Sequence, residues 1–461
     1  MFSMNKMKIS LVFPPLYGVD MPPLGLAYIA GQLISNGYDV SVFCFNSQLY
    51  VESKDKQFLW DWDNSDYWTS LDKISMNFNV PDLLENWTNA VLESKPRIIG
   101  LSVNSHSRVL ANLLADTFKK KAKDVCIVFG GPWCAEVMEN GELNNNVDLY
   151  VRGEGEKIIS RIAEKIERGE DLKGAAIAGT IINTGSGFKD NGWDANFLDI
   201  DSIAFPALNL FDFERYTNKT EIPIIFSRGC NYSCAFCTDA PIWGKYRMRS
   251  AGNILDEMIK HSQFFGRRRF KCSDLMVNGD LVKLEQLADK IISVKNHFEW
   301  GGMARARAEM SQEFLYKINK AGAIYFTYGI ESGAVRVLKH MGKPLKKHIS
   351  QALARTHRAG IRVNTLWMVG YPVERWSDVI ETMLFLLRNR KNIDEFVSVS
   401  CCYIPHKSRL WKEQESLSIC YTKDSQWYIR GKNSLWVRIL RKKMLLMLAK
   451  VLGVYRGGIP Q

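Results

Sequence analysis

The chain has 461 residues, which is too long for one ordinary domain and predicts two or three. Hydrophobic residues make up 46% and charged residues 24%, the composition of a soluble globular protein, and no apolar run is long enough for a transmembrane helix. The net charge is +12, and twelve Lys and Arg stand against three Asp and Glu between Pro405 and Gln461, so most of the excess lies at the C-terminus.

Residues 1–168 alternate between short apolar runs and segments with helical spacing. The start offers no small-residue cleavage site, so a signal peptide is not expected. The strand-like runs are KISLVFPP (8–15), SVFCF (41–45), RIIGLSVNS (97–105), CIVFGGPW (126–133) and the start of 148–169. Buried strands separated by helices form parallel sheets covered on both faces. We therefore predict a doubly wound, Rossmann-like α/β domain with an aromatic insertion at 57–80.

Residues 169–220 are rich in Gly, Asn and Asp, which predicts a linker or a small sheet between domains. A second α/β alternation occupies residues 221–405. Its strand-like runs are IPIIFSRGC (222–230), RFKCSDLMVNG (269–279), FEWGGMARAR (298–307), AIYFTYGIESG (323–333), RVNTLWMVGYP (362–372) and EFVSVSCCYIP (395–405). Strand–helix units at this spacing predict a partial (β/α)6 TIM-type barrel, in which functional side chains follow the strand C-termini.

Residues 406–461 leave this alternation and predict a short, basic, helical extension. Its main helix is expected at SLWVRILRKKMLLMLAKVLG (434–453), where Leu, Met, Trp and Ile are interleaved with Arg and Lys. Two interpretations stay open. The helix docks on the barrel as its last element, or it lies on anionic lipid as a basic amphipathic helix.

Three cysteines, Cys230, Cys234 and Cys237, lie close together directly after the first barrel strand. The ten cysteines of the whole chain are too scattered for a disulfide framework, so metal-binding thiols in a reducing cytoplasm are expected. A structural zinc site would need a fourth ligand, for which Asp239 and His261 are candidates. Three thiolates on a four-iron cluster would instead leave one iron open to an exogenous molecule.

The triplet, with Phe236 before its last cysteine, resembles the cluster loop of radical S-adenosylmethionine (SAM) enzymes. GIESGAVRVLKHMGKP (329–344) and VGYPVERWSDVIETMLFL (369–386) resemble the fifth- and sixth-strand segments of that family. The first 165 residues resemble the cobalamin-binding domain fused to one branch of it, through FPPLYGVDMPPLGLAYIAGQL, IIGLSVNS, IVFGGPW and VRGEGE. The resemblance implies that the three cysteines ligate a [4Fe–4S] cluster, that SAM binds the fourth iron, and that an electron cleaves SAM to a radical that abstracts a substrate hydrogen.

The resemblance also implies which residues at the strand ends contact SAM. They are Phe236, Asp274, Arg305, Arg307, Glu331, Ser332, Gly370, Pro372 and Tyr403. Glu331 would accept hydrogen bonds from the ribose or the amino group, and one arginine would pair with the carboxylate. The 370–372 turn and Tyr403 would frame the adenine. Helix capping by Glu331 and ordinary packing of the turn are the structural alternatives.

For cobalamin, the resemblance implies contacts from loops that follow the strands of the first domain. The candidates are Pro23, Leu24, Gly25, Ser102, Asn104, Ser105, Gly130, Gly131, Pro132, Gly153, Glu154 and Gly155. Such loops form the ligand crevice of doubly wound sheets. Many cobalamin domains carry Asp-x-His-x-x-Gly after the first strand, but this chain has YGVDMPPLG (17–25) and no histidine there. His106 follows a different strand, and the alternative is a domain that keeps the fold without the cofactor.

The leading functional prediction is a cobalamin-dependent radical SAM methyltransferase that acts on an unactivated carbon. The second keeps the radical chemistry but catalyses a rearrangement, cyclisation or oxidation. An RNA methylthiotransferase would need three further cluster cysteines, and Cys44, Cys126 and Cys134 are poorly spaced for that. A zinc-stabilised, non-enzymatic interaction protein is the minor alternative.

The expected partners are a small-molecule, lipid or peptide substrate and a reductant such as flavodoxin or ferredoxin. Nucleic acid is not expected. The protein is predicted to be cytoplasmic, with the C-terminal helix as a site of peripheral contact with the inner face of a membrane.

Overall fold

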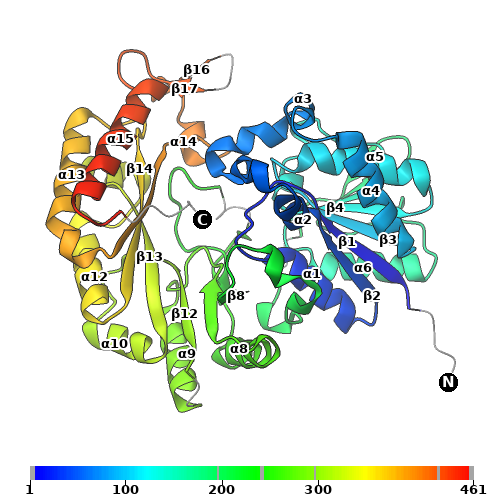
Figure 1. Ribbon diagram of the computed structural model, residues 1–461, viewed down its shortest axis with the longest axis horizontal. Helices are drawn as coiled ribbons and strands as arrows, with labels where there is room; N and C mark the ends of the chain where they lie inside the picture. Colours follow the sequence, from blue (N-terminus) through cyan, green and yellow to red (C-terminus); the bar gives the residue numbers. More distant parts are fainter. Residues whose placement is uncertain (1–5, 195–196, 239–242, 295–296, 423–425, 456–461) are drawn as a thin grey trace. The chain divides into compact units, whose positions relative to one another are not determined.

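The computed structural model describes residues 6–194, 197–238, 243–294, 297–422 and 426–455. The chain divides into two compact units, with the boundary between Lys219 and Thr220 (Figure 1). Each unit is built on its own largely parallel sheet, which confirms the predicted α/β class. Among the described residues, no helix has the length and apolar character needed to span a membrane.

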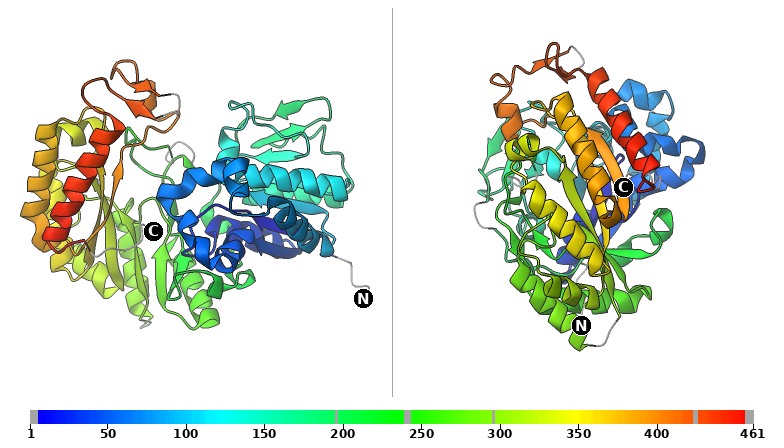
Figure 2. Two further views of the ribbon diagram at one scale, coloured as in Figure 1. Left: turned by 45° about the horizontal axis from the view of Figure 1, so that its top comes forward. Right: turned by 90° about the vertical axis from the view of Figure 1, so that its left-hand side faces the viewer.

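The first unit carries a seven-stranded sheet with the order β2-β1-β3-β4-β5-β6-β7. Its first five strands run parallel: β1 (Lys8–Phe13), β2 (Asp39–Cys44), β3 (Ile98–Ser102), β4 (Cys126–Gly130) and β5 (Leu149–Val151). Helices α1 (Leu24–Ser35) and α6 (Glu156–Glu167) pack together on one face, and α4 (Val80–Glu93) and α5 (Arg108–Lys121) on the other (Figures 1 and 2). This is the predicted doubly wound arrangement, in which crossover helices cover both faces of buried strands.

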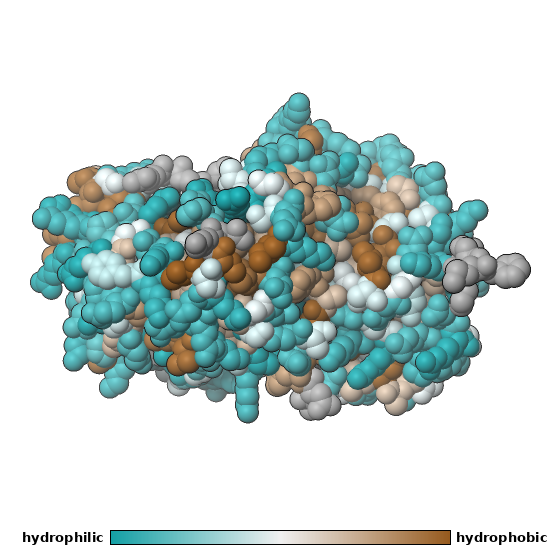
Figure 3. All heavy atoms as spheres, turned by 90° about the horizontal axis from the view of Figure 1, so that it is seen from below, coloured by the Kyte–Doolittle hydropathy of each residue, from teal (hydrophilic) through white to brown (hydrophobic). Residues whose placement is uncertain are grey.

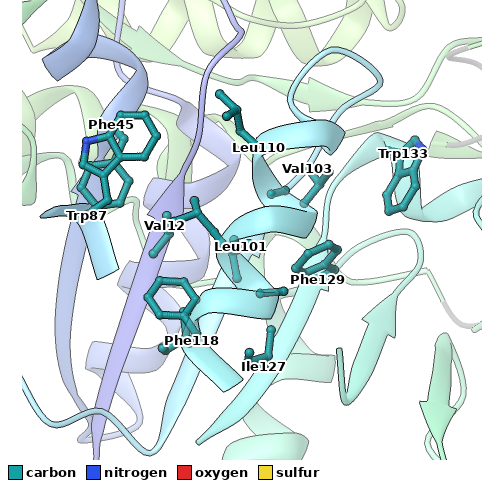
Figure 4. Close-up of a cluster of buried hydrophobic side chains, with 14 of the residues drawn as sticks. Val12, Phe45, Trp87, Leu101, Val103, Leu110, Phe118, Ile127, Phe129 and Trp133 are labelled. Atoms are coloured by element: carbon teal, nitrogen blue, oxygen red, sulfur yellow. The ribbon is translucent and has the colours of Figure 1, made fainter. Parts of the chain in front are cut away.

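The main core of the first unit lies between the sheet and the face covered by α4 and α5 (Figure 4). The predicted insertion takes part in this core. It forms η1 (Lys54–Trp60), η2 (Trp62–Thr69) and α3 (Leu71–Ser75), and its Trp68 and Ile74 are fully buried. Next to it, Phe45 of α2 (Phe45–Glu52) stacks on Trp87 with 4.7 Å between ring centroids. Trp60, Trp68 and Phe78 of this segment are therefore packing residues, whereas Phe58 and Trp62 are exposed.

The segment predicted as a linker or a small sheet, residues 169–220, belongs to the first unit up to Lys219. Strand β6 (Thr180–Asn183) extends the sheet antiparallel to β5, and β7 (Phe188–Asp190) pairs antiparallel to β6. The chain then packs on α1, where the Ala207 N–H donates to the Ala27 carbonyl at 2.9 Å. A Cβ on Gly31 of α1 would lie 2.1 Å from the Phe205 carbonyl oxygen, so the two segments touch backbone to backbone.

The second unit contains a six-stranded parallel sheet whose strands follow one another in chain order. The strands are β8 (Glu221–Ile224), β11 (Arg269–Cys272), β12 (Glu299–Ala304), β13 (Ala323–Glu331), β14 (Arg362–Val369) and β15 (Glu395–Cys401). The main helices between them are α8 (Ala251–Phe265), α9 (Leu281–Ser293), α10 (Gln312–Lys320), α11 (Val335–Met341), α12 (Lys346–Arg358) and α13 (Trp376–Asn389). This order is that of the predicted partial (β/α)6 barrel.

The basic C-terminal extension packs on the barrel as its last element. After α14 (Arg409–Lys412) and a small ribbon of β16 (Cys420–Tyr421) and β17 (Trp427–Tyr428), helix α15 (Leu435–Val451) runs along β15 and beside α13 (Figures 1 and 2). The Phe396 N–H donates to the Val454 carbonyl at 2.7 Å and ties the end of the extension to the start of β15. The docking interpretation of this helix is therefore right.

Apolar side chains are not confined to the interior. On the face that Figure 3 shows, hydrophobic residues form exposed patches between hydrophilic ones. Single exposed apolar residues are normal in globular proteins, whereas contiguous patches often mark surfaces that bind a partner.

The close approach of α1 to residues 205–207 generates a stability prediction. We expect Gly31→Ala to lower the midpoint of thermal unfolding by roughly 2–10 °C, because the new methyl group meets a backbone carbonyl that cannot rotate away. The control is Gly25→Ala in the same helix, where a Cβ meets nothing within 4 Å. Circular dichroism melts compare the three proteins. Equal midpoints for the two variants would contradict this packing of residues 205–207 on α1.

Candidate functional site

The three cysteines lie on an irregular loop that leaves the first barrel strand. Strand β9 (Ser227–Arg228) lies shortly after β8 and pairs with β10 (Arg247–Met248). Gly229 and Cys230 come directly after β9. Gly229 has φ +80°, and a Cβ there would lie 2.5 Å from the Lys245 carbonyl oxygen, so the loop starts at a position that favours glycine. The Ala235 N–H donates to the Met341 carbonyl at 3.0 Å. The loop is therefore fixed at its start, by Gly229, and between Cys234 and Cys237, by Ala235.

The donor set of this loop fits an iron–sulfur cluster better than a single metal ion. All three thiols are free of disulfides and partly exposed. Within the described ranges, no three His, Cys, Asp or Glu side chains are gathered closely enough to hold one ion. A cluster makes no such demand, because each thiolate binds a different iron. The three cysteines would hold the cluster and leave its fourth iron for SAM.

Of the two candidate zinc ligands, only His261 lies within the described residues, and it has other partners. Asp239 lies outside the described residues. His261 is buried in α8, with its Nε2 3.8 Å from Glu257, and the same carboxylate lies 2.7 Å from the buried guanidinium of Arg249. This internal pair supports the end of β8, since Arg249 also donates to the Ile225 carbonyl at 2.8 Å. Arg249 is therefore an internal support and not an ordinary surface charge.

Arg305 turns toward the cysteine loop from the end of β12. Its guanidinium lies 3.6 Å from the centre of the Tyr232 ring, its Nη1 lies 3.5 Å from the Cys234 Sγ, and its Nη2 donates to the Gly342 carbonyl at 2.7 Å. The guanidinium thus holds two residues of the loop and the end of α11 at once.

Arg307 has a different environment. Its Nη1 donates to the carbonyls of Asn278 and Gly279, both at 2.9 Å, and so secures the turn that precedes α9. Asn278 in turn receives the Arg305 backbone N–H on its side-chain oxygen at 2.9 Å. Of the two arginines predicted for SAM, only Arg305 therefore contacts the cysteine loop, and its donors are already engaged by protein atoms.

Asp274 is buried at the end of β11 and binds backbone. Its carboxylate accepts hydrogen bonds from the Phe226 N–H at 3.1 and 3.0 Å and from the N–H and hydroxyl of Ser227. Burial raises the pKa of Asp274 to about 6, and these donors act in the opposite direction. The carboxylate therefore fixes the chain that leads into the cysteine loop, which makes it a positioning residue and leaves its predicted contact with SAM without geometric support.

Glu331 ends β13 in a conformation that non-glycine residues rarely adopt. Its φ is +65°, and the pairing of β13 with β14 shifts register between Gly329 and Glu331. Its carboxylate lies 3.1 Å from Lys343 Nζ, and both side chains are mostly buried. Lys343 also donates to the Gly329 carbonyl at 2.9 Å and lies 5.5 Å from the centre of the Phe236 ring in the cysteine loop. Such local strain is typical of functional sites.

Ser332 is fully buried and has structural partners. Its hydroxyl lies 3.1 Å from the Thr382 hydroxyl and accepts the Ala334 N–H at 3.1 Å, just before α11 begins. These contacts give Ser332 a place in the packing of α11 on α13, and they do not direct its hydroxyl toward a ligand.

The turn after β14 packs against helix α15 and the residue Asn433 just before it. Gly370 has φ +72°, and a Cβ there would lie 2.2 Å from Cγ of Arg438. Its N–H donates to Glu374 at 2.6 Å, and its carbonyl accepts from Asn433 at 2.9 Å. Pro372 is buried in the same turn. Tyr403, predicted to help frame the adenine, is 71% exposed on the segment after β15.

Sequence reasoning missed the two arginines beneath this turn. Arg438 and Arg441 are each 1% exposed, and Arg441 pairs with the buried Glu374 at 3.1 Å. Arg438 lies 4.0 Å from the centre of the Trp427 ring and donates to the Trp427 carbonyl at 2.9 Å. Burial raises the pKa of Glu374 to about 7, and Arg441 opposes the rise. The sequence signal that could have found them is the spacing of residues 438, 441, 445 and 449, which places all four on one face of the helix.

In the first unit, the cobalamin candidates follow strands whose C-terminal ends share one edge of the sheet. Gly25, Ser105, Gly131, Pro132 and Gly153 are exposed, Leu24, Ser102, Asn104, Gly130, Glu154 and Gly155 are half-buried, and Pro23 is buried. Because β1, β3, β4 and β5 run parallel, the topology brings these loops together as predicted. Five of the twelve are thus exposed, and they could meet a ligand through backbone and small side chains.

Asn104 and Glu154 have protein partners within this edge. The Asn104 amide donates to the Leu16 carbonyl at 2.9 Å and accepts the N–H of His106 at 2.8 Å, so it joins the loops after β1 and β3. Glu154 accepts the Leu198 N–H at 3.1 Å. The His106 ring packs against Trp62 of the insertion, 5.7 Å between centroids, and burial lowers its pKa below the usual value.

Comparisons with known proteins identify the family of the barrel. Residues 224–386 match the Radical SAM superfamily, so the barrel is a radical SAM domain. An uncharacterised methyltransferase of Pyrococcus horikoshii is 24% identical over 83% of this chain and 78% of its own length. The anaerobic magnesium-protoporphyrin IX monomethyl ester cyclase of Synechocystis is 23% identical over 83% of this chain and 72% of its own.

A solved structure shares the fold of both units. The radical SAM methyltransferase TsrM of Kitasatospora setae, with cobalamin and a [4Fe–4S] cluster bound, superposes with a TM-score of 0.67. It is 17% identical, and the match covers 90% of this chain and 79% of that one. Residues 224–386 are therefore the radical SAM domain of an enzyme that uses SAM and a [4Fe–4S] cluster, and the chain as a whole shares the fold of TsrM.

The position of Arg305 generates a prediction about cluster binding. We expect Arg305→Gln to lower cluster affinity about 10- to 100-fold, because the loop loses the group that braces Tyr232 and Cys234. Iron and sulfide per chain, measured at limiting iron after anaerobic reconstitution, report the effect. The control is Arg307→Gln, which loses its contacts to Asn278, Gly279 and Glu309. Full iron content in Arg305→Gln with a raised KM for SAM would instead make Arg305 a SAM ligand.

Proposed function

We propose that this radical SAM enzyme is a cobalamin-dependent methyltransferase that acts on an unactivated carbon. The observation that supports the proposal most is the shared fold of the whole chain with a methyltransferase that binds both cobalamin and the cluster. The similarity includes the first unit, whose accessible strand-end loops have no role in SAM cleavage itself. A relative named as a methyltransferase, which matches along most of this chain, supports the same reaction.

When bound, the reduced cluster and SAM supply a radical that removes a hydrogen atom, and cobalamin supplies a carrier for the methyl group. The three cysteine thiolates of this chain would hold three irons. Asp274 binds the backbone that leads into the loop, and Arg305 contacts Tyr232 and Cys234 within it. These contacts would hold the thiolates in place for the cluster.

Glu331 is the residue best placed to bind SAM. Its carboxylate is held by a single lysine on the side of the cysteine loop where Phe236 lies. Lys343 Nζ lies 3.1 Å from the carboxylate and holds it in position. The carboxylate would accept hydrogen bonds from the ribose hydroxyls or the amino group of SAM, as the family resemblance implies.

The first unit would bind cobalamin along the loops after β1, β3, β4 and β5. Glycines at 130, 131, 153 and 155 let the backbone approach a bulky corrin, and Gly131 and Gly153 have φ of +101° and +81°. The loop at 17–25 contains no histidine, and His106 is packed against Trp62. We therefore expect the lower face of cobalt to lack a protein imidazole.

A second candidate function keeps the radical chemistry without methyl transfer. It is favoured by the similarity to the cyclase of Synechocystis, which covers as much of this chain as the methyltransferase relative does. The two candidates differ in products. Methyl transfer yields S-adenosylhomocysteine together with 5′-deoxyadenosine, whereas a rearrangement, cyclisation or oxidation yields only 5′-deoxyadenosine.

The remaining parts of the proposal concern partners. The substrate is a small molecule, a lipid or a peptide, and the electron donor is a flavodoxin or ferredoxin. The enzyme works in the cytoplasm and can lie peripherally at the inner face of a membrane.

Anaerobic reconstitution with iron, sulfide, SAM and cobalamin tests the function. We expect a brown protein that retains cobalamin through gel filtration and forms 5′-deoxyadenosine on reduction. Cys234→Ala should abolish the product and the colour, while Cys420→Ala, a partly exposed cysteine outside the loop, should change neither. A colourless protein that contains zinc, or a chain that never retains cobalamin, would contradict the proposal.

The role of Glu331 gives a separate prediction. We expect Glu331→Gln to raise the KM for SAM about 10- to 100-fold with the cluster intact, because a hydrogen bond to a charged acceptor becomes a neutral one. Formation of 5′-deoxyadenosine against SAM concentration measures this. Ser332→Ala is the control, since its hydroxyl binds Thr382 and Ala334. An unchanged KM in Glu331→Gln would reduce Glu331 to a partner of Lys343.

A further inference from the structure

Helix α15 buries two of its charged residues and exposes several of its apolar ones. Its inward face includes Arg438 and Arg441, each 1% exposed. Its outward residues include Trp436, Met447 and Val451, which are 70%, 69% and 75% exposed. The two inward guanidiniums are used by the turn after β14, as described for Gly370 and Glu374. The outward apolar residues have no such use inside the barrel.

The neighbouring helix α13 exposes a second apolar stripe. Ile380, Leu384 and Leu387 are 55%, 43% and 45% exposed, at the spacing of one helix face. The two helices lie side by side in both figures, and the Arg441 guanidinium lies 4.9 Å from the centre of the Trp376 ring at the start of α13 (Figures 1 and 2). We call Ile380, Leu384, Leu387, Trp436, Met447 and Val451 together the α13–α15 face.

The charges on α15 have one sign, and the carboxylates of α13 are paired with cations. Residues 434–455 contain five Lys and Arg and no Asp or Glu, and Lys443 and Lys450 are exposed on α15. On α13, Asp378 is buried with Arg336, and Glu381 pairs with Lys346 at 2.7 Å. An apolar surface bordered by lysines suits a partner that is apolar inside and negative at its edge.

We propose that the α13–α15 face binds the surface of an anionic lipid membrane. Aliphatic side chains such as Leu384 and Val451 can enter the boundary between headgroups and acyl chains, while Lys443 and Lys450 meet the phosphates. This deepens the peripheral location proposed above and does not depend on methyl transfer.

Other occupants fit the same face less well. A symmetric dimer through it would place the lysines of one copy opposite those of the other, and like charges repel. RNA would use the lysines, but it would leave Ile380, Leu384, Leu387, Met447 and Val451 in contact with water or phosphate. Aliphatic residues offer neither hydrogen bonds nor stacking to bases.

Vesicle flotation with the reconstituted full-length enzyme tests the proposal. The vesicles contain phosphatidylcholine alone or phosphatidylcholine with phosphatidylglycerol. We expect the enzyme to float only with the anionic vesicles, and 0.5 M NaCl to weaken this binding because salt screens the lysines. The double variant Met447→Glu, Val451→Glu should bind at least about tenfold more weakly, since two carboxylates would have to enter the headgroup boundary.

The matched control is the double variant Val282→Glu, Tyr316→Glu. These residues are 67% and 50% exposed on α9 and α10, outside the α13–α15 face, and the change in charge is the same. It should float as the unaltered enzyme does. Thermal melts and 5′-deoxyadenosine formation without vesicles should be unchanged in both variants, so that loss of lipid binding is separated from loss of fold or of radical chemistry.

Three results would overturn the membrane proposal. The first is absence of flotation with anionic vesicles, and the second is equal loss in the control variant. The third is a dimer in light scattering, or a complex with RNA in a gel shift, that Met447→Glu, Val451→Glu abolishes while vesicle binding is unaffected. Failure to retain cobalamin would contradict methyl transfer alone and would leave the lipid surface standing.

Discussion

The structure depends on parallel strands whose C-terminal ends meet at one edge of each sheet. The backbone groups inside the sheets are paired with neighbouring strands, so only the loops at the strand ends are available for ligands. In the barrel, that edge carries the cysteine loop after β8, Arg305 after β12 and Glu331 at the end of β13. In the first unit, it carries the glycine-containing loops. The same constraint thus produces both candidate sites.

Buried charged residues support the strand ends and turns that form the barrel site. Asp274 binds the backbone that leads into the cysteine loop, and Arg249 with Glu257 supports the same strand end. Beneath the turn after β14, Arg441 pairs with Glu374. A buried ion pair adds little net stability, but removing one partner is costly because the other stays charged in a low dielectric. We interpret these pairs as positioning groups that keep the strand-end turns in one arrangement.

Several features followed from the residues alone. The alternation of apolar runs and helices predicted both sheets and their parallel strands, and the cysteine spacing with its flanking motifs predicted the cluster loop. The prediction for Asp274 did not anticipate its buried hydrogen bonds, because an acidic residue at a strand end has the same pattern whether it binds a ligand or a backbone. The segment at 169–220 was hard to place, since Gly-rich composition does not show that Gly31 receives it at close contact.

The sequence by itself determined the order of the elements, the close spacing of three thiols and the absence of a histidine at 17–25, because these depend on residue type and spacing. Only the tertiary structure decided which side chains converge. It directed Arg305 to Cys234 and Arg307 to the turn before α9, and it turned Arg438 inward while Trp436 faces out. The physical reason is that spacing along a chain defines a face of an element, whereas packing against other elements decides what that face meets.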